Sequence, residues 1–88
     1  MRWVAIFEDN PHAHFEYLAQ HAEKIQMAGG LRHEPDQAFC GGLWVLAVDS
    51  RQEAIELCEN DPYFTLGLRT GYRLYVWGKA PVYGDVIL

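Results

Sequence analysis

Cysteine is scarce in this 88-residue chain, and basic side chains are few. Cys40 and Cys58 are too few for a disulfide framework and too far apart for a CxxC motif. Both are therefore expected to be free thiols, with Cys58 a small core residue. The 7 basic residues stand against 12 acidic ones, a net charge of −5. Because no Lys/Arg cluster is present to meet phosphates, a nucleic acid is not an expected partner.

Long hydrophobic runs are also missing. No apolar stretch approaches the roughly 20 residues of a membrane-spanning helix, and the N-terminus lacks the pattern of a signal peptide. The sequence therefore predicts a cytoplasmic protein without a membrane partner. Half of the residues are nonetheless hydrophobic. We expect one domain over residues 1–88, small enough that its core is near the lower limit of self-sufficiency and that dimerisation is favoured.

The hydrophobic pattern predicts alternating strands and helices. Residues 1–9 are apolar on both faces, as expected for a buried strand, and a helical stripe follows from Pro11 to Ala28. Residues 31–40 are polar and contain Pro35, which indicates a weak edge strand with a loop. Residues 43–48 are again apolar on both faces and predict a central strand.

The second half of the chain has clear start and stop signals. Ser50 and Glu53 have the spacing of a capping box, which predicts a short helix after residue 50. Asp61-Pro62 should interrupt that helix and begin another turn. Residues 71–78 alternate in polarity and predict the last strand. The C-terminal segment that follows is apolar to its end.

The order β-α-β-β-α-β predicts an α+β, ferredoxin-like fold with both helices on one face of an antiparallel sheet. The other face would carry bulky apolar side chains, which we expect to include Trp3, Trp44, Tyr75 and Trp77. An exposed apolar face of this size favours a cover. We therefore expect a homodimer packed sheet to sheet. Alternatively, the C-terminal segment folds back over that face or reaches across to a partner.

The four histidines do not have the spacing of a metal site. His14 and His21 lie about 10 Å apart along a helix, and His12 and His14 point to different sides of its first turn. No metal is therefore predicted. No glycine-rich phosphate-binding motif follows a strand either, and no cofactor is predicted.

Acid–base chemistry is better supported by the pattern. His12 and His14 lie in the expected first turn of the first helix, where the helix dipole favours the neutral imidazole that can accept a proton. Asp61 stands directly before Pro62, where an aspartate commonly caps a helical turn. Both observations also fit a purely structural role, with polar residues at solvated helix starts.

The chain resembles the YciI-like, or YCII-related, family. The similarity is carried by HFEYL from His14 to Leu18, by Gly41-Gly42 before an apolar strand, and by the DP-aromatic element of Asp61, Pro62 and Tyr63 with Gly67 following. It covers nearly the whole chain. The resemblance implies a ferredoxin-like fold of the dimeric α/β-barrel type, a small-molecule substrate, and a site built from the first-helix histidine and the DP aspartate. Relatives have been associated with lyase activity on halogenated aromatic compounds.

Individual positions follow from this resemblance. His14 is preferred to His12 as the family histidine, because Tyr17 and Leu18 follow it at the expected spacing. The arginine that the family commonly carries shortly before the histidine is replaced here by Asp9-Asn10-Pro11. Its anion-holding role would therefore be vacant or fall to Arg73 or Arg69. The expected substrate-binding residues are Tyr17, Tyr63 and Arg73.

The residues and the resemblance together suggest one mechanism. His14 would act as general base or acid and Asp61 would orient it or stabilise its charge, in lyase or isomerase chemistry on a small aromatic or carbonyl compound. Two other functions remain open. The chain could be a non-catalytic, small-ligand-binding or regulatory dimer, or a structural partner domain in which the Asx-Pro elements are only caps.

Overall fold

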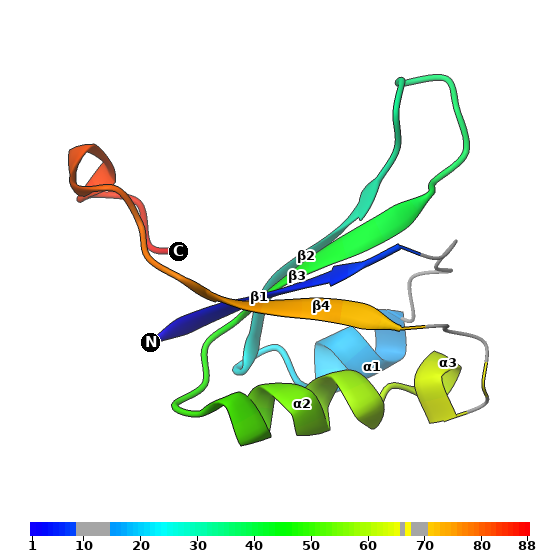
Figure 1. Ribbon diagram of the computed structural model, residues 1–88, viewed down its shortest axis with the longest axis horizontal. Coiled ribbons are helices and arrows are strands. Elements are labelled where there is room, and N and C mark those ends of the chain that lie inside the picture. Colours follow the sequence, from blue (N-terminus) through cyan, green and yellow to red (C-terminus); the bar gives the residue numbers. More distant parts are fainter. Residues whose placement is uncertain (9–14, 66, 68–70) are drawn as a thin grey trace.

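A computed structural model describes residues 1–8, 15–65, 67 and 71–88 of the chain. Helices lie beneath one face of a sheet, and the C-terminal segment lies on the other side of it (Figure 1). Along the chain the elements are β1 (Arg2–Phe7), α1 (Phe15–Gln20), β2 (Ile25–Leu31), β3 (Gly41–Leu46), α2 (Arg51–Glu59), α3 (Pro62–Thr65), β4 (Tyr72–Trp77) and the 3₁₀ helix η1 (Pro81–Tyr83).

The four strands form one sheet in the order β2-β3-β1-β4, and each neighbouring pair is antiparallel. β1 therefore lies in the middle, hydrogen-bonded to β3 and β4, which is the central position predicted from its two apolar faces. The predicted α+β class, with an antiparallel sheet and helices packed against it, is confirmed.

The core lies between the sheet and the helices. Ala5 and Phe7 of β1 face it together with Trp44 and Leu46 of β3, and all four are buried. Trp3 is also buried on this side, at 8% exposure. The prediction that Trp3 and Trp44 lie on the uncovered face is therefore wrong. Strands apolar on both faces give no local signal of which face the helices will cover, so the assignment had no basis in periodicity.

The first helix ends well before the predicted Ala28. α1 ends at Gln20, the carbonyl oxygen of His21 accepts hydrogen bonds from the amides of Lys24 and Ile25, and residues 25–28 then belong to β2. Residues 9–14 lie outside the described part. Ile25 pairs with Leu46 across the sheet, so strand pairing overrides the helical spacing of the apolar residues.

The predicted edge strand over residues 31–40 is consequently displaced. β2 ends at Leu31, and residues 32–40 form the connection to β3, which projects away from the rest of the sheet (Figure 1). Gly29 and Gly30, which directly follow the predicted helix, lie within β2. The polar composition of residues 32–40 thus marks a loop, as Pro35 suggested.

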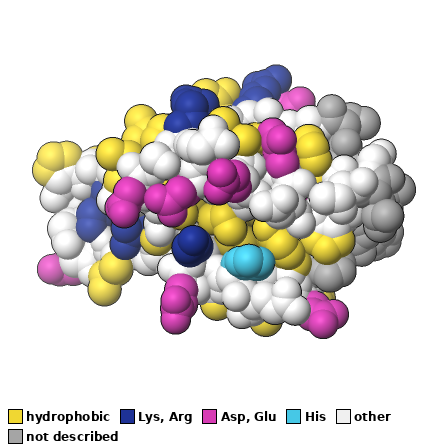
Figure 2. Space-filling view, turned by 90° about the horizontal axis from the view of Figure 1, so that it is seen from below, with side chains coloured by type: hydrophobic (Ala, Val, Ile, Leu, Met, Phe, Trp, Pro, Cys, Tyr) yellow, Lys and Arg dark blue, Asp and Glu magenta, His cyan; other side chains and the backbone are white. Residues whose placement is uncertain are grey.

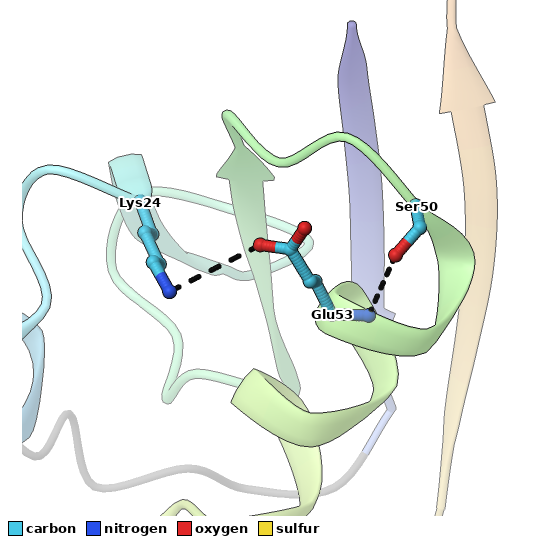
Figure 3. Close-up of polar contacts among 3 residues, drawn as sticks. All are labelled: Lys24, Ser50 and Glu53. Atoms are coloured by element: carbon cyan, nitrogen blue, oxygen red, sulfur yellow. Dashed lines mark hydrogen bonds and ion pairs between the residues drawn. The ribbon is translucent and has the colours of Figure 1, made fainter.

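The start of α2 agrees with its sequence signal. The Ser50 side-chain oxygen accepts a hydrogen bond from the Glu53 amide at 3.2 Å, so the serine half of the predicted capping box is confirmed. The Glu53 carboxylate instead faces Lys24, with 4.0 Å between Nζ and Oε2 (Figure 3). α2 ends at Glu59, and α3 begins at Pro62, as the Asp61-Pro62 element predicted.

The uncovered face of the sheet is apolar. Val4, Val45 and Tyr75 share this face by strand register. A groove of about 420 Å³ runs along it, and its lining residues include Val4, Met27, Leu43, Val45, Trp77 and Leu88. Tyr75 and Trp77 are half-exposed here, at 50% and 44%. The expectation of a hydrophobic uncovered face is correct for these two side chains.

The helix-bearing side has a different surface. Acidic side chains are spread across it between patches of hydrophobic side chains (Figure 2). No helix in the described ranges has the length and hydrophobicity needed to cross a lipid bilayer.

Candidate functional site

Asp61 occupies the turn between α2 and α3, and its side chain is fully buried. Its carbonyl oxygen accepts hydrogen bonds from the amides of Phe64 and Thr65 at 2.9 and 3.0 Å. Pro62 follows as the first residue of α3, where its fixed φ suits a helix start. The short helix therefore holds the Asp61 backbone firmly while its carboxylate points into the interior. Full burial of an aspartate is uncommon and marks the position as a candidate site.

Tyr17 lies close to this aspartate. It comes from α1, is 6% exposed, and donates a hydrogen bond from its hydroxyl to the carbonyl oxygen of Leu57 in α2 at 2.6 Å. Burial, and next the negative charge of Asp61, raise the pKa of Tyr17 to about 12. Its phenol is therefore neutral at physiological pH. The hydroxyl proton is directed at Leu57, so this hydrogen bond joins the two helices.

Tyr17 and Asp61 are buried, and Tyr17 has aromatic neighbours. The Tyr17 ring stacks with Trp44 at 6.2 Å between centroids and lies 4.5 Å from the ring of His21. Cys58 is fully buried, as predicted, and is a further contributor to the raised pKa of Tyr17. Charge interactions are stronger in such an environment than in water.

A second tyrosine links the last strand to α2. The Tyr72 hydroxyl donates a hydrogen bond to Glu59 Oε2 at 2.8 Å, and its ring contacts Phe7 and Phe64. Burial and this hydrogen bond raise the pKa of Tyr72 above its ordinary value. These contacts fix α3, and with it Asp61, against the end of the sheet at which β1 ends and β4 begins.

Arg73 lies at the same end of the sheet but on the opposite face from Tyr17. It pairs with Ile6 in the register of β1 and β4, and its guanidinium forms an ion pair with Glu8 at 2.9 Å. Both side chains are more than half exposed. A small cavity of about 220 Å³ is lined here by Glu8, Gly71, Tyr72 and Arg73. The structure therefore brings Tyr17 and Asp61 together but does not place Arg73 beside them.

The remaining predicted site residues lie outside the described part. His14 and its alternative His12 belong to residues 9–14, and Arg69 belongs to residues 68–70. Tyr63 is in α3, and its side chain is outside the described part. α1 begins at Phe15, directly after His14. Among the described residues, no group of His, Cys, Asp or Glu is arranged to hold a metal ion.

Sequence reasoning did not identify Cys58, Tyr72 and Glu8 as neighbours of the site. Cys58 precedes Asp61 by three residues, a spacing that could have suggested a shared environment. Tyr72 and Glu8 come near one another only through the register of β4 against β1. That register depends on strand pairing and has no local sequence signal.

Tyr17→Phe tests the contact between α1 and α2. At neutral pH the variant should be less stable by about 1 kcal/mol, because the Leu57 carbonyl loses its partner. The protonated phenol is favoured in the folded state, so its stabilisation is complete below pH 10 and is lost as the pH rises to about 12. Measured by urea unfolding between pH 8 and 12, the free energy of unfolding should therefore fall less steeply with pH in Tyr17→Phe than in the wild type.

Tyr83→Phe, at an exposed position, is the control and should keep the pH dependence of the wild type. The same pH dependence in all three proteins would contradict the assignment.

The fold is shared with an enzyme of known structure. The chain is similar to 5-chloro-2-hydroxyhydroquinone dehydrochlorinase (TftG) from Burkholderia phenoliruptrix AC1100, solved in complex with 2,5-dihydroxybenzoquinone. The TM-score is 0.74 at 23% identity, and the match covers 91% of this chain and 96% of that one. At this identity the likeness establishes a common fold.

Comparison with curated proteins finds no match. The model of the YCII-related domain, in contrast, matches residues 2–78, from the start of β1 to just beyond the end of β4. The chain therefore belongs to the YCII-related domain family.

Proposed function

We propose that this protein is a small-molecule enzyme in which His14 and Asp61 form an acid–base pair. The reaction would be of the lyase or isomerase type, on a small aromatic or carbonyl compound. The observation that carries the proposal is the fully buried Asp61, held at the end of the sheet beside Tyr17 in a chain of the YCII-related family.

The roles follow from the chemistry of the two groups. His14 would take a proton from the substrate as a neutral imidazole and return it to the product or to the leaving group. Asp61 would orient the imidazole and stabilise the positive charge that forms on it. A buried carboxylate suits this role because its charge acts over a short distance in a poorly polarisable environment.

The other predicted residues have supporting roles in this proposal. Tyr17 would hold α1, which starts directly after His14, against α2, which ends just before Asp61. Tyr63 would contact the substrate from α3. Arg73, on the opposite face of the sheet from Tyr17, would hold an anionic group of a substrate that extends past the end of the sheet, in exchange for its ion pair with the exposed Glu8.

The substrate class is suggested by the structural neighbour. TftG is named for dehydrochlorination of a hydroxyhydroquinone, and its structure holds a dihydroxybenzoquinone. Elimination of this kind needs a group that accepts a proton as the leaving group departs, which matches the role proposed for His14. Hydroxylated and halogenated aromatic rings are therefore the first compounds to test.

We further propose a homodimer of the dimeric α/β-barrel type, packed through the uncovered face of the sheet. Tyr75 and Trp77, which are about half exposed, supply apolar surface that favours such packing, whereas Val4 and Val45 on the same face are already buried. The alternative is a dimer that binds a small ligand without changing it. The apolar groove on that face favours this alternative, since its lining offers almost no chemically active side chain.

A paired binding and turnover screen tests the proposal. Wild type, His14→Ala and the exposed-loop control His33→Ala would be screened against halogenated hydroquinones and hydroxybenzoquinones by thermal shift and product analysis. We expect turnover in wild type and His33→Ala and its loss in His14→Ala. Binding by all three proteins without turnover in any would favour the ligand-binding alternative and contradict the enzymatic one.

A further inference from the structure

The last ten residues form a segment beyond the family domain. The family match ends at residue 78, and residues 79–88, the C-terminal arm, follow β4. The arm turns through η1 and returns to the uncovered side of the sheet (Figure 1). Its last residue, Leu88, lines the apolar groove. The matched residues do not include the arm, so a role for it has to be argued from the arm's own contacts.

The arm is held to its own chain by few polar contacts. The Gln26 side-chain amide in β2 donates to the carbonyl oxygen of Ile87 and so ties the arm to the sheet, whereas Lys79, itself a residue of the arm, donates from Nζ to the carbonyl oxygens of Gly84 and Val86 within the arm. All three contacts are at the surface, where hydrogen bonds exchange readily with water. The observed attachment is therefore weak for a segment of this length.

The arm also carries apolar side chains that its own chain leaves exposed. Val82 is 82% exposed and Ile87 is 76% exposed, and Tyr83 and Val86 are about half exposed. Four such side chains within six residues, next to an apolar groove, form a surface that lacks a cover in one copy of the chain.

The area of the uncovered sheet face indicates that the arm contacts a second copy of this chain. Four strands spaced about 4.8 Å apart and each about 20 Å long present a flat footprint of roughly 400 Å². A stable interface generally buries about 800 Å² on each partner. The side chains on this face have more accessible surface than the flat footprint, but Val4 and Val45 are already buried in one copy, so the adjoining apolar arm adds exposed surface to the homodimer proposed above.

We infer that the C-terminal arm packs on a second copy of this chain and completes the homodimer interface around the sheet face. This inference rests on the proposed homodimer. In the dimer, the outward side chains Val82 and Ile87 would be buried against the partner, while Leu88 would close the groove between the two sheets.

Sedimentation equilibrium of three variants tests the arm and the sheet face separately. The arm variant is V82D/I87D, the sheet-face variant is Tyr75→Asp, and the control is Phe15→Asp. Phe15 is as exposed as Ile87, at 76%, but lies on α1 on the helix-bearing side, where an aspartate suits the first turn. Because all of the substituted residues are half or more exposed, folding should survive, which far-UV circular dichroism would confirm.

We expect the dimer dissociation constant to rise by about 100-fold or more in the arm variant and in Tyr75→Asp, and to stay unchanged in Phe15→Asp. An arm variant that dimerises like the wild type, while Tyr75→Asp does not, would overturn the inference and leave the proposed homodimer intact. If the wild-type chain is monomeric at about 100 μM, its self-association is too weak for an interface of standard size. That result would overturn both the role of the arm and the proposed homodimer.

Discussion

Asp61→Asn is expected to lower turnover of a hydroxylated aromatic substrate by about 10²- to 10⁴-fold, the range that a positioned acid–base group contributes. The asparagine has nearly the same shape, so it fills the same buried space but removes the charge that would stabilise a protonated His14. Steady-state kinetics on the best substrate of the screen measures the loss. It should fall mainly on kcat, because the charge matters most as the imidazolium forms.

The matched control is Asp36→Asn, the same chemical change at an exposed position in the β2–β3 connection. It should leave the kinetics unchanged. Equal activity of Asp61→Asn and wild type, with both proteins folded, would show that the buried carboxylate has only a structural role as a cap.

Gly41→Ala is expected to cause a large loss of stability. A Cβ at residue 41 would lie 2.3 Å from the carbonyl oxygen of Phe7, so the backbones of β1 and β3 would have to separate. Overpacking of this kind costs about 3 kcal/mol. For a small domain, whose total stability is about 5–10 kcal/mol, this is a large fraction.

Gly29→Ala provides the comparison for this effect. Gly29 lies in β2, and an added Cβ would meet no atom within 4 Å. Its stability should change by less than about 1 kcal/mol, and an increase is expected because alanine is less costly than glycine to order in a strand. Urea denaturation of both variants measures the difference, and similar midpoints would show that the close approach at Gly41 does not exist.

Features of the fold with local physical signals could be predicted from the sequence. Ser50 marks the start of α2 because its hydroxyl satisfies an amide at the helix end. Pro62 marks the break between α2 and α3, since it lacks the amide hydrogen that would continue a helix. The alternation of Tyr72 and Leu74 with Arg73 and Tyr75 correctly separates the two faces of β4.

Features set by tertiary pairing could not be predicted in this way. Residues from Phe15 to Ile25 have helical spacing, yet Phe15 is 76% exposed, and Ile25 belongs to a strand. The decisive interaction is the ladder between β2 and β3, which forms between segments far apart in sequence. These residues therefore have helical spacing, but pairing between β2 and β3 stabilises the strand more than the spacing favours a helix.

The candidate site also combines features that have a local sequence signal with features that depend on tertiary packing. An aspartate before a proline indicates a cap, and the backbone carbonyl of Asp61 does accept hydrogen bonds from α3. Its complete burial beside Tyr17 results from packing of α2 and α3 under the sheet and has no local signal. Likewise, only strand register decides that Arg73 lies on the face opposite Tyr17.

A crystal structure of this chain with 2,5-dihydroxybenzoquinone would decide whether His14 and Asp61 form an acid–base pair at a substrate. We expect the quinone ring at the end of the sheet, with an oxygen about 3 Å from the His14 imidazole and Asp61 within reach of that histidine directly or through one water. A ring bound instead in the apolar groove beside Val45 and Trp77, with His14 more than about 8 Å from Asp61, would contradict it.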